Sequence, residues 1–189
     1  MILRKLKFKT VNSTNDIAIS LIKKNKLSPS IIIADNQKKG RGTMGKQWIS
    51  KNGNIFISIY FCFKSEKIKV EELSVLNSFI IKNILEKYSK HKLTIKWPND
   101  ILINKQKLCG TLQEIVSFKL KKYLIIGIGI NTFNSPENKK FKATSLVLNS
   151  KYKFKNNEII KKIKKSYELL ISDIDKYKLS YLKKKIMNY

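Results

Sequence analysis

Continuous runs of apolar residues constrain the fold of this chain more than any other feature. They lie at residues 31–34, 55–63 and 123–130, are rich in isoleucine, and the second is broken only by Ser58. Each run is far shorter than the roughly 20 residues that cross a bilayer, so no membrane span is expected. Because apolar runs without alternation are typical of strands covered on both faces, they predict a buried sheet with helices packed on it.

Helices are expected in three parts of the chain. The first begins within residues 12–16, after a strand over 5–11, because serine and threonine side chains there can cap a helix. A second covers residues 70–88, and from Asn156 the helical period returns in two further helices. The apolar faces consist of Leu73, Leu76, Ile80 and Ile84 in the second helix, and of Ile160, Ile163, Tyr167, Leu170, Ile174, Leu182 and Ile186 in the last two.

This mixture of strands and helices predicts an α+β fold, with a mixed or antiparallel sheet backed by helices. We expect one domain over residues 1–189, with a core at 5–148 and C-terminal helices at 156–187. Two cysteines, Cys62 and Cys109, show neither a metal-ligand spacing nor a disulfide framework. The N-terminus has charges within its apolar residues and does not resemble a signal peptide, so a reducing cytoplasm is expected.

The formal net charge of +27 invites a nucleic-acid interpretation. Arg4 and Arg41 are the only arginines, however, and the lysines are dispersed along the whole chain. Proteins that recognise a nucleic-acid sequence rely on bidentate hydrogen bonds from arginine, so no specific nucleic-acid partner is expected. Non-specific affinity for polyanions at low salt is still expected. His91, the single histidine, lies in a polar stretch and is expected at the surface.

A strand–turn–strand pattern follows the second helix. Residues 94–97 and 101–103 alternate as short strands on either side of Pro98, which has no N–H to donate to a ladder. A tight turn at 104–105 then leads into a longer strand over 106–116. The pattern predicts a hairpin whose start and end lie close together.

Polar residues gather at this predicted hairpin. Asn99 and Asp100 follow Pro98, Lys107 lies near the start of the returning strand, and Gly110 marks a place of close approach. A cation beside an acidic, amide-rich corner suits a phosphate or an activated acyl group. The alternative is a plain hairpin with a solvated lysine and a turn aspartate, and the residue types alone favour it.

A glycine-rich loop is predicted over residues 36–53. Gly40, Gly42 and Gly45 interrupt it, and a loop of this length inside a compact domain is either functional or disordered. Before it, Ser13 and Asn15 open the first predicted helix, where capping alone would explain them.

Four stretches in order resemble the biotin protein ligases, the biotin–acetyl-CoA-carboxylase ligases. They are Ser13-Thr14-Asn15, the loop Gly40–Gly45 with Gln37 and Trp48, the sequence Lys96-Trp97-Pro98-Asn99-Asp100 with Lys107-Leu108-Cys109-Gly110, and Gly127–Asn131. Each is weak alone, but the ordered set is specific. The resemblance covers roughly residues 5–148 and implies a catalytic domain of the class II synthetase-like, biotin and lipoate ligase type.

The resemblance implies a ligase that works in two steps. Biotin and ATP, with Mg²⁺, would form biotinyl-5′-AMP, and a lysine of the biotin carboxyl carrier protein would then attack this acyl-adenylate. Some members of the family form homodimers side by side through the sheet. Neither a membrane nor a specific nucleic acid is implied as a partner.

The resemblance also implies roles for individual residues. The catalytic positions would be Lys107, Arg41 and Asp100, and Asp100 would either hold Mg²⁺ or assist the attacking lysine. Biotin would be bound by Ser13, Thr14, Asn15, Gln37, Gly40, Arg41, Gly42, Thr43, Lys107 and Gly110. The nucleotide and adenylate would be bound by Arg41, Trp48, Asn99, Lys107 and Asn131.

The chain departs from the family pattern in two ways. Many bacterial members carry a further arginine after the second loop glycine, where this chain has Thr43. Neither an N-terminal winged helix-turn-helix nor a C-terminal SH3-like barrel is expected, so repressor activity is not expected. Three alternatives stay open: a lipoate–protein ligase, which usually has an Arg-Arg pair and a triple glycine, a basic nucleic-acid-binding protein, and an inactive relative.

Overall fold

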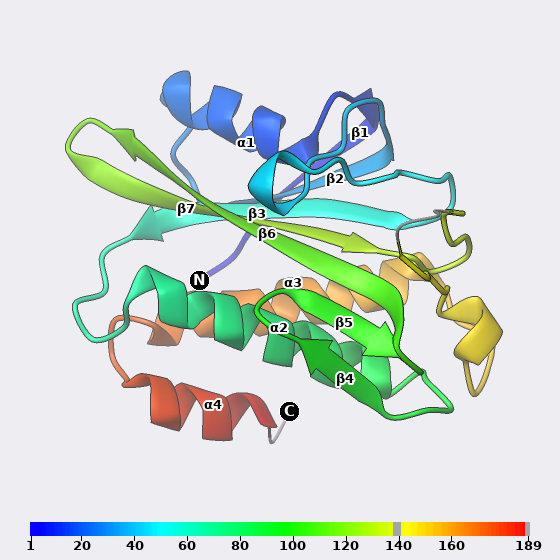
Figure 1. Ribbon diagram of the computed structural model, residues 1–189. Coiled ribbons are helices and arrows are strands. Elements are labelled where there is room, and N and C mark those ends of the chain that lie inside the picture. Colours follow the sequence, from blue (N-terminus) through cyan, green and yellow to red (C-terminus); the bar gives the residue numbers. More distant parts are fainter. Residues whose placement is uncertain (138–140, 188–189) are drawn as a thin grey trace.

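Seven strands form a single sheet in the computed structural model, which describes residues 1–137 and 141–187 (Figure 1). Their order in the sheet is β1-β2-β3-β7-β6-β5-β4. The strands are β1 (Arg4–Val11), β2 (Ser30–Gln37), β3 (Ile55–Phe63), β4 (Leu93–Lys96), β5 (Asp100–Ile103), β6 (Gln106–Phe118) and β7 (Lys121–Ile130). Only β1 and β2 pair in parallel, and every other neighbouring pair is antiparallel.

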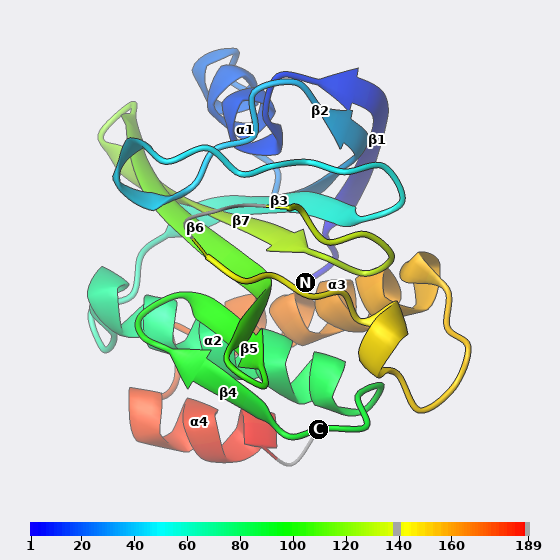
Figure 2. The same cartoon turned by 45° about the vertical axis from the view of Figure 1, so that its right-hand side comes forward.

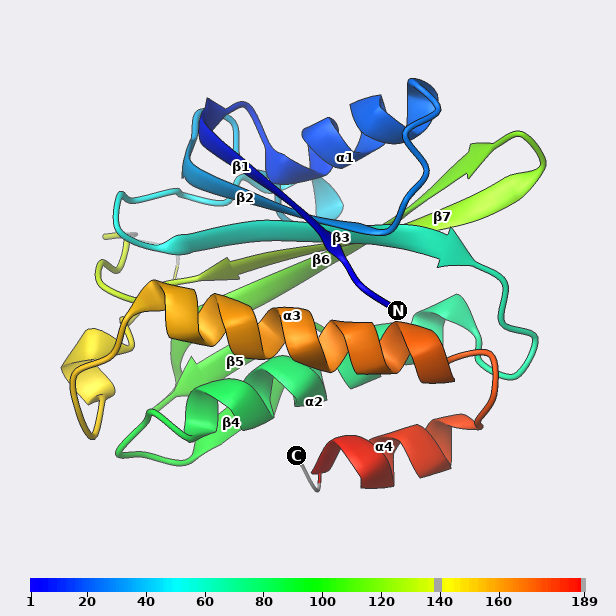
Figure 3. The same cartoon turned by 180° about the vertical axis from the view of Figure 1, so that it is seen from behind.

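Helices cover both faces of the sheet (Figures 1 and 3). The helices are α1 (Thr14–Lys23), α2 (Val70–Glu86), α3 (Asn156–Asp173) and α4 (Leu179–Met187). Helix α1 lies on one face and connects the parallel strands β1 and β2. Helices α2 and α3 lie on the opposite face, and α4 packs against α2. The arrangement confirms the predicted α+β class, a mixed sheet backed by helices.

The main core lies between the sheet and helices α2 and α3. Isoleucines of β2, β3 and β7 pack there against Leu76, Ile80, Ile163 and Tyr167, all of which are buried. A smaller core lies under α1 on the other face. Because both faces of the central strands are covered, their sequences stay apolar without alternation, as the apolar runs predicted.

Strand β7 changes character along its length. Ile126, Ile128 and Ile130 belong to the core under α2 and α3. On the opposite face Tyr123 and Ile125 pack under α1, but the next two positions on that face are Gly127 and Gly129. On the face covered by α1, β7 therefore carries no side chains at these two positions, and the bare backbone forms a shallow floor.

Element boundaries differ little from the sequence predictions. Helix α2 ends at Glu86 rather than Tyr88, and β6 continues to Phe118. Helix α4 was predicted partly from Ile186, whose side chain lies outside the described residues. No helix in the described parts of the chain combines the length and apolar character needed to cross a membrane. The single-domain organisation stays a prediction.

Candidate functional site

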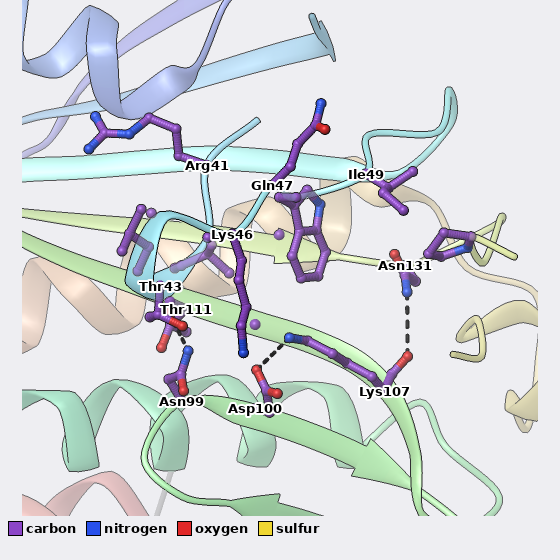
Figure 4. Close-up of a pocket in the computed structure, with 18 of the residues that line it drawn as sticks. Arg41, Thr43, Lys46, Gln47, Ile49, Asn99, Asp100, Lys107, Thr111 and Asn131 are labelled. Carbon is purple, nitrogen blue, oxygen red and sulfur yellow. Dashed lines mark hydrogen bonds and ion pairs between the residues drawn. The ribbon is translucent and has the colours of Figure 1, made fainter. Parts of the chain in front are cut away.

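A cavity of about 970 Å³ opens on the α1 face of the sheet. The N-terminal end of α1 and the loop between β2 and β3 lie above it, and β5, β6 and β7 lie below (Figures 2 and 4). Its volume is typical of sites for small ligands and cofactors. All four stretches that carry the family resemblance contribute to its lining.

The floor is formed by glycines on adjacent strands. Gly110 of β6 lies directly opposite Gly129 of β7, and Leu112 lies opposite Gly127. A Cβ atom at Gly127 would lie 2.4 Å from Asn15 Oδ1, and one at Gly129 would lie 2.4 Å from Trp48 Cε2. The glycines thus allow the first turn of α1 and an aromatic ring to lie directly on the backbone of the sheet.

Trp48 lies over this floor. A Cβ atom at Gly110 would be 2.9 Å from its Cζ3 atom, so the ring covers both floor strands. Its indole Nε1 is buried and has no hydrogen-bond partner among the described residues. An indole N–H usually finds an acceptor when buried, so its position favours contact with a ligand.

Lys107 and Asp100 form an ion pair at one side of the cavity (Figure 4). Lys107 Nζ lies 2.7 Å from Asp100 Oδ1, and the two side chains are only 25% and 21% exposed. Asp100 Oδ1 nevertheless has no partner with hydrogen-bond geometry among the described residues, so the contact is best described as a pair of charges. The Lys107 ammonium also lies 5.4 Å from the Trp48 ring centre and 5.9 Å from that of Phe141.

Two amides fix the surroundings of this ion pair. Asn99 donates from Nδ2 to the Thr111 carbonyl at 2.9 Å, while the Thr111 amide donates to the Asn99 carbonyl, also at 2.9 Å. Asn131, buried directly after β7, donates weakly to the Lys107 carbonyl at 3.4 Å, and its own Oδ1 has no partner within residues 1–137 and 141–187. The bonds of Asn99 close the hairpin, and Asn131 keeps a free acceptor in the cavity wall.

The ends of the parallel strands form the opposite wall. Ser13 follows β1 and caps α1, since its Oγ accepts a hydrogen bond from the backbone N–H of Asn15 at 3.2 Å. Gln37 ends β2, and its Oε1 accepts from the Thr14 amide at 2.8 Å. Ser13, Thr14 and Asn15 are all buried. Carboxyl ends of parallel strands meet at one edge of a sheet, which explains why residues more than 20 positions apart lie together.

The loop over the cavity is ordered by its own hydrogen bonds. Gly42 N donates to the Lys46 carbonyl at 2.7 Å, and Trp48 N donates to the Gly40 carbonyl at 2.9 Å. A short turn over Thr43–Gly45 closes this small hairpin, with Gly45 at φ +70°. Lys46 extends from the loop down towards Asp100 (Figure 4). The predicted loop is therefore structured and lies over the site.

Arg41 lines the same cavity, but its guanidinium points away from Lys107 and Asp100 (Figure 4). It bonds instead to Asp16 Oδ1 at 2.7 Å and to Glu114 Oε1 at 2.5 Å. Burial acts to lower the pKa of Arg41, but the hydrogen bonds and charges of the two carboxylates outweigh it and raise the pKa. The structure thus brings Lys107 and Asp100 together and leaves the Arg41 side chain apart from them.

The charge around the cavity is strongly positive. Asp100 is the one acidic residue among the described lining residues. The basic ones are Arg41, Lys46, Lys96, Lys105, Lys107 and Lys142. This excess of positive charge suits a ligand with several negative charges, such as a nucleoside triphosphate beside a carboxylate.

Cys109 lies beneath the floor and is fully buried. Burial and the nearby charge of Asp100 raise the pKa of its thiol, so the thiol stays protonated at neutral pH. Cys109 therefore contributes packing to the site and no nucleophile.

Glu114 was missed by the sequence reasoning. It lies on β6, bonds to Arg41 through one carboxylate oxygen and accepts from Asn15 Nδ2 at 2.6 Å through the other. A signal was present, because a charged residue stands there inside a long run of strand-forming residues. The partners are 73 and 99 positions away, and no local pattern identifies them.

A family model, the biotin/lipoate A/B protein ligase family, matches residues 7–131. The chain belongs to this family, as the four motifs indicated. The bifunctional ligase/repressor BirA of Bacillus subtilis is 34% identical over 128 residues, which are 67% of this chain. The match covers 39% of the length of that relative.

Solved structures agree with this assignment. The biotin protein ligase from Aquifex aeolicus, in complex with biotin and ATP, superposes with a TM-score of 0.78 at 28% identity, over 97% of this chain and 76% of that one. A bipartite lipoate protein ligase from Thermoplasma acidophilum superposes with a TM-score of 0.64 at 8% identity, over 100% of this chain and 93% of that one. The latter likeness concerns the fold alone.

Proposed function

We propose that the chain activates biotin with ATP as biotinyl-5′-AMP and transfers biotin to a lysine of the biotin carboxyl carrier protein. One observation carries the proposal: the Lys107–Asp100 pair lies beside a glycine floor in a cavity whose other charged lining residues, among those described, are all cations. Membership of the biotin/lipoate ligase family supports it. The cytoplasm is the proposed location.

In the first step a carboxylate oxygen of biotin attacks the α-phosphorus of ATP, the bond from that phosphorus to the pyrophosphate oxygen breaks, and pyrophosphate leaves. Two anions must approach each other, so cations lower the barrier by offsetting their repulsion. Lys107 is the proposed cation between carboxylate and phosphate, and Lys46 faces the same space (Figure 4). Trp48 and Asn131 would contact the nucleotide, and Asn99 would hold the hairpin beside it.

The polar wall would bind the ureido ring of biotin. Ser13, Thr14 and Asn15 are buried, and together with the partly buried Gln37 they line one end of the cavity with polar groups. The floor at Gly110 and the loop residues Gly40, Gly42 and Thr43 would enclose the ligand. A closed loop excludes water from the mixed anhydride, which hydrolyses readily.

Asp100 is the proposed Mg²⁺ ligand. Mg²⁺ is commonly held by one or two carboxylates together with substrate phosphates, and Asp100 Oδ1 is a buried oxygen to which no group in the described part of the chain donates a hydrogen bond. When bound there, the ion would neutralise phosphate charge. Among the described residues no cluster of three or more His, Cys, Asp or Glu side chains could hold a metal by itself, so the phosphates would have to complete the site.

In the second step the amine of the acceptor lysine attacks the acyl carbon, an amide bond forms, and AMP leaves with the bonding electrons. The acceptor amine must lose a proton, and Asp100 is the carboxylate placed to accept it if Mg²⁺ is bound elsewhere. A homodimer is proposed as an arrangement in which the chain could act.

The test is biotin-dependent release of pyrophosphate from Mg-ATP, followed by the mass of a carrier domain. We expect release with biotin and the added mass of one biotin per carrier domain. Release with lipoate and none with biotin would contradict the proposal and favour a lipoate ligase. Release with neither, together with tight salt-dependent binding of one nucleic acid, would favour the nucleic-acid alternative.

A further inference from the structure

Glu114 joins three segments that surround the cavity. Its Oε1 accepts from Arg41 Nη2 at 2.5 Å, and its Oε2 accepts from Asn15 Nδ2 at 2.6 Å. Arg41 belongs to the loop over the cavity, Asn15 to the first turn of α1 and Glu114 to β6. One carboxylate thus connects the loop, the helix and the floor.

The connection continues into the polar wall. Asn15 Oδ1 accepts from Ser58 Oγ at 2.5 Å, and Ser58 Oγ lies 2.7 Å from Thr14 Oγ1. Thr14 in turn donates to Gln37 Oε1 from its amide. Both functional groups of the Asn15 amide are therefore satisfied, and its orientation depends on Glu114 on one side and on Ser58 on the other.

Of the two carboxylates that hold Arg41, Glu114 is the better placed. The side chain of Asp16 is 45% exposed, whereas that of Glu114 is 21% exposed. Exposed ion pairs contribute little because water screens them. Glu114 is less screened, and the bond to Asn15 restricts its rotation, so its contact should hold Arg41 more firmly.

Anchoring Arg41 also anchors the aromatic ring over the floor. Arg41 pairs across the small loop hairpin with Gln47, the residue before Trp48. The bonds between Gly40 and Trp48 and between Gly42 and Lys46 make this hairpin one unit. A restraint on Arg41 is therefore transmitted to Trp48 through a few backbone bonds.

We propose that Glu114 is a positioning residue whose contacts with Arg41 and Asn15 latch the loop onto helix α1. This latch orders the polar wall and the loop together. The expected effect on biotin binding rests on the proposed function, whereas the latch itself is a property of the protein without ligands. Glu114 itself does not line the cavity, so it acts through Arg41 and Asn15.

The decisive variant is Glu114→Gln, which keeps the size of the side chain and removes its charge. In the protein without ligands, we expect hydrogen exchange at the amides of Gly42, Lys46 and Trp48 to become about tenfold faster, as loss of one charge-assisted bond predicts. Asp35→Asn is the matched control, because it removes a carboxylate from an exposed pair with Lys7 outside the loop. Its exchange should equal that of the wild type.

Kinetics supply the second measurement. Glu114→Gln should raise KM for biotin by about tenfold while kcat of pyrophosphate release changes less than about twofold, because the groups proposed for the chemistry are untouched. Arg41→Gln breaks the same contact from the other side, so the double variant should have a KM for biotin no higher than that of the worse single variant. Asp16→Asn should have a smaller effect.

Exchange at wild-type rates in Glu114→Gln, or effects of Glu114→Gln and Arg41→Gln that simply add, would overturn the latch. Arg41→Gln alone decides the question if Glu114→Gln does not fold, since Arg41 lies in a surface loop. A wild-type protein that releases no pyrophosphate with biotin would refute the proposed function and leave the exchange test of the latch intact.

Discussion

Single side chains at the site combine opposite charges with missing hydrogen bonds. Lys107 and Asp100 form a partly buried pair, and three buried polar atoms around the cavity, Trp48 Nε1, Asp100 Oδ1 and Asn131 Oδ1, have no hydrogen-bond partner among the described residues. Trp48 Nε1 and Asn131 Oδ1 each cost about 1–3 kcal/mol of folding free energy when they stay unsatisfied, whereas the nearby charge of Lys107 offsets this cost at Asp100 Oδ1. A ligand that satisfies them would stabilise the folded protein as it binds.

Replacing Lys107 tests the proposed chemistry most directly. Lys107→Ala should slow adenylate formation by about ten- to a hundredfold at saturating biotin and ATP, because a charge-assisted contact in a partly buried site is lost. Lys121→Ala, an exposed lysine at the start of β7, is the control and should keep full activity. Circular dichroism and pyrophosphate release are the measurements. Near wild-type turnover in Lys107→Ala would remove this residue from the reaction.

Thr43 should affect the retention of the intermediate. A threonine hydroxyl binds phosphate more weakly than an arginine fork, so we expect slow escape of the adenylate and labelling of nearby lysines when no carrier is present. Thr43→Arg should reduce this self-labelling several-fold, measured by mass spectrometry after incubation with biotin and ATP. An unlabelled natural protein would mean that another cation holds the phosphate, and Lys46→Ala then identifies it.

At the scale of elements, the site exists because strands β6 and β7 lose their side chains at the same level. Gly110 and Gly129 are opposite each other in the ladder, and the ring of Trp48 lies on both. The loop and helix α1 then complete the walls from the ends of β2 and β1. The sheet supplies a fixed surface, and the connections supply the polar groups.

Adding one methyl group to the floor should disturb both ligand binding and stability. In Gly129→Ala the new Cβ would lie 2.4 Å from Trp48 Cε2, so the ring must move. Overpacking of this kind costs about 1–3 kcal/mol, and we expect a higher KM for ATP together with a lower unfolding midpoint. Trp48→Ala is the partner variant: the stability loss caused by Gly129→Ala should disappear in its background. An equal loss in both backgrounds would show that the ring and Gly129 do not meet.

Much of the element pattern could be predicted from the sequence, because it depends on local spacing. The apolar runs became β2, β3 and β7, and the helical faces became α2 and α3. The sheet order could not be predicted, because β7 lies between β3 and β6 and this placement depends on long-range pairing. The position of the Arg41 side chain could not be predicted for the same reason, since its partners Asp16 and Glu114 are distant in sequence.

The candidate site shows the same division. Lys107 and Asp100 belong to one predicted hairpin, and the structure brings them together. Ser13 caps α1, as its position before the helix indicated, and it also lines the cavity. Trp48 has no local reason to lie on Gly129, because only the paired glycines of two strands make room for it.

For the whole molecule, the excess of 40 basic over 13 acidic residues dominates the electrostatics. An acidic carrier domain would be attracted to such a surface, and this attraction is screened by salt. We expect kcat/KM for biotin transfer to an acidic carrier domain to fall by about fivefold or more between about 0.02 and 0.5 M salt. Adenylate formation from small molecules should change less and is the control. Transfer that does not respond to ionic strength would contradict steering by the basic surface.

The glycine floor has a consequence for how such a protein can change. Backbone alone expresses little preference for one ring system over another, so discrimination between ligands falls to the first turn of α1 and to the loop. Neither belongs to the main core under α2 and α3. A few substitutions at these borders could therefore redirect the chain to a different acid while the scaffold that drives folding stays as it is, which makes the ligand easier to exchange than the fold.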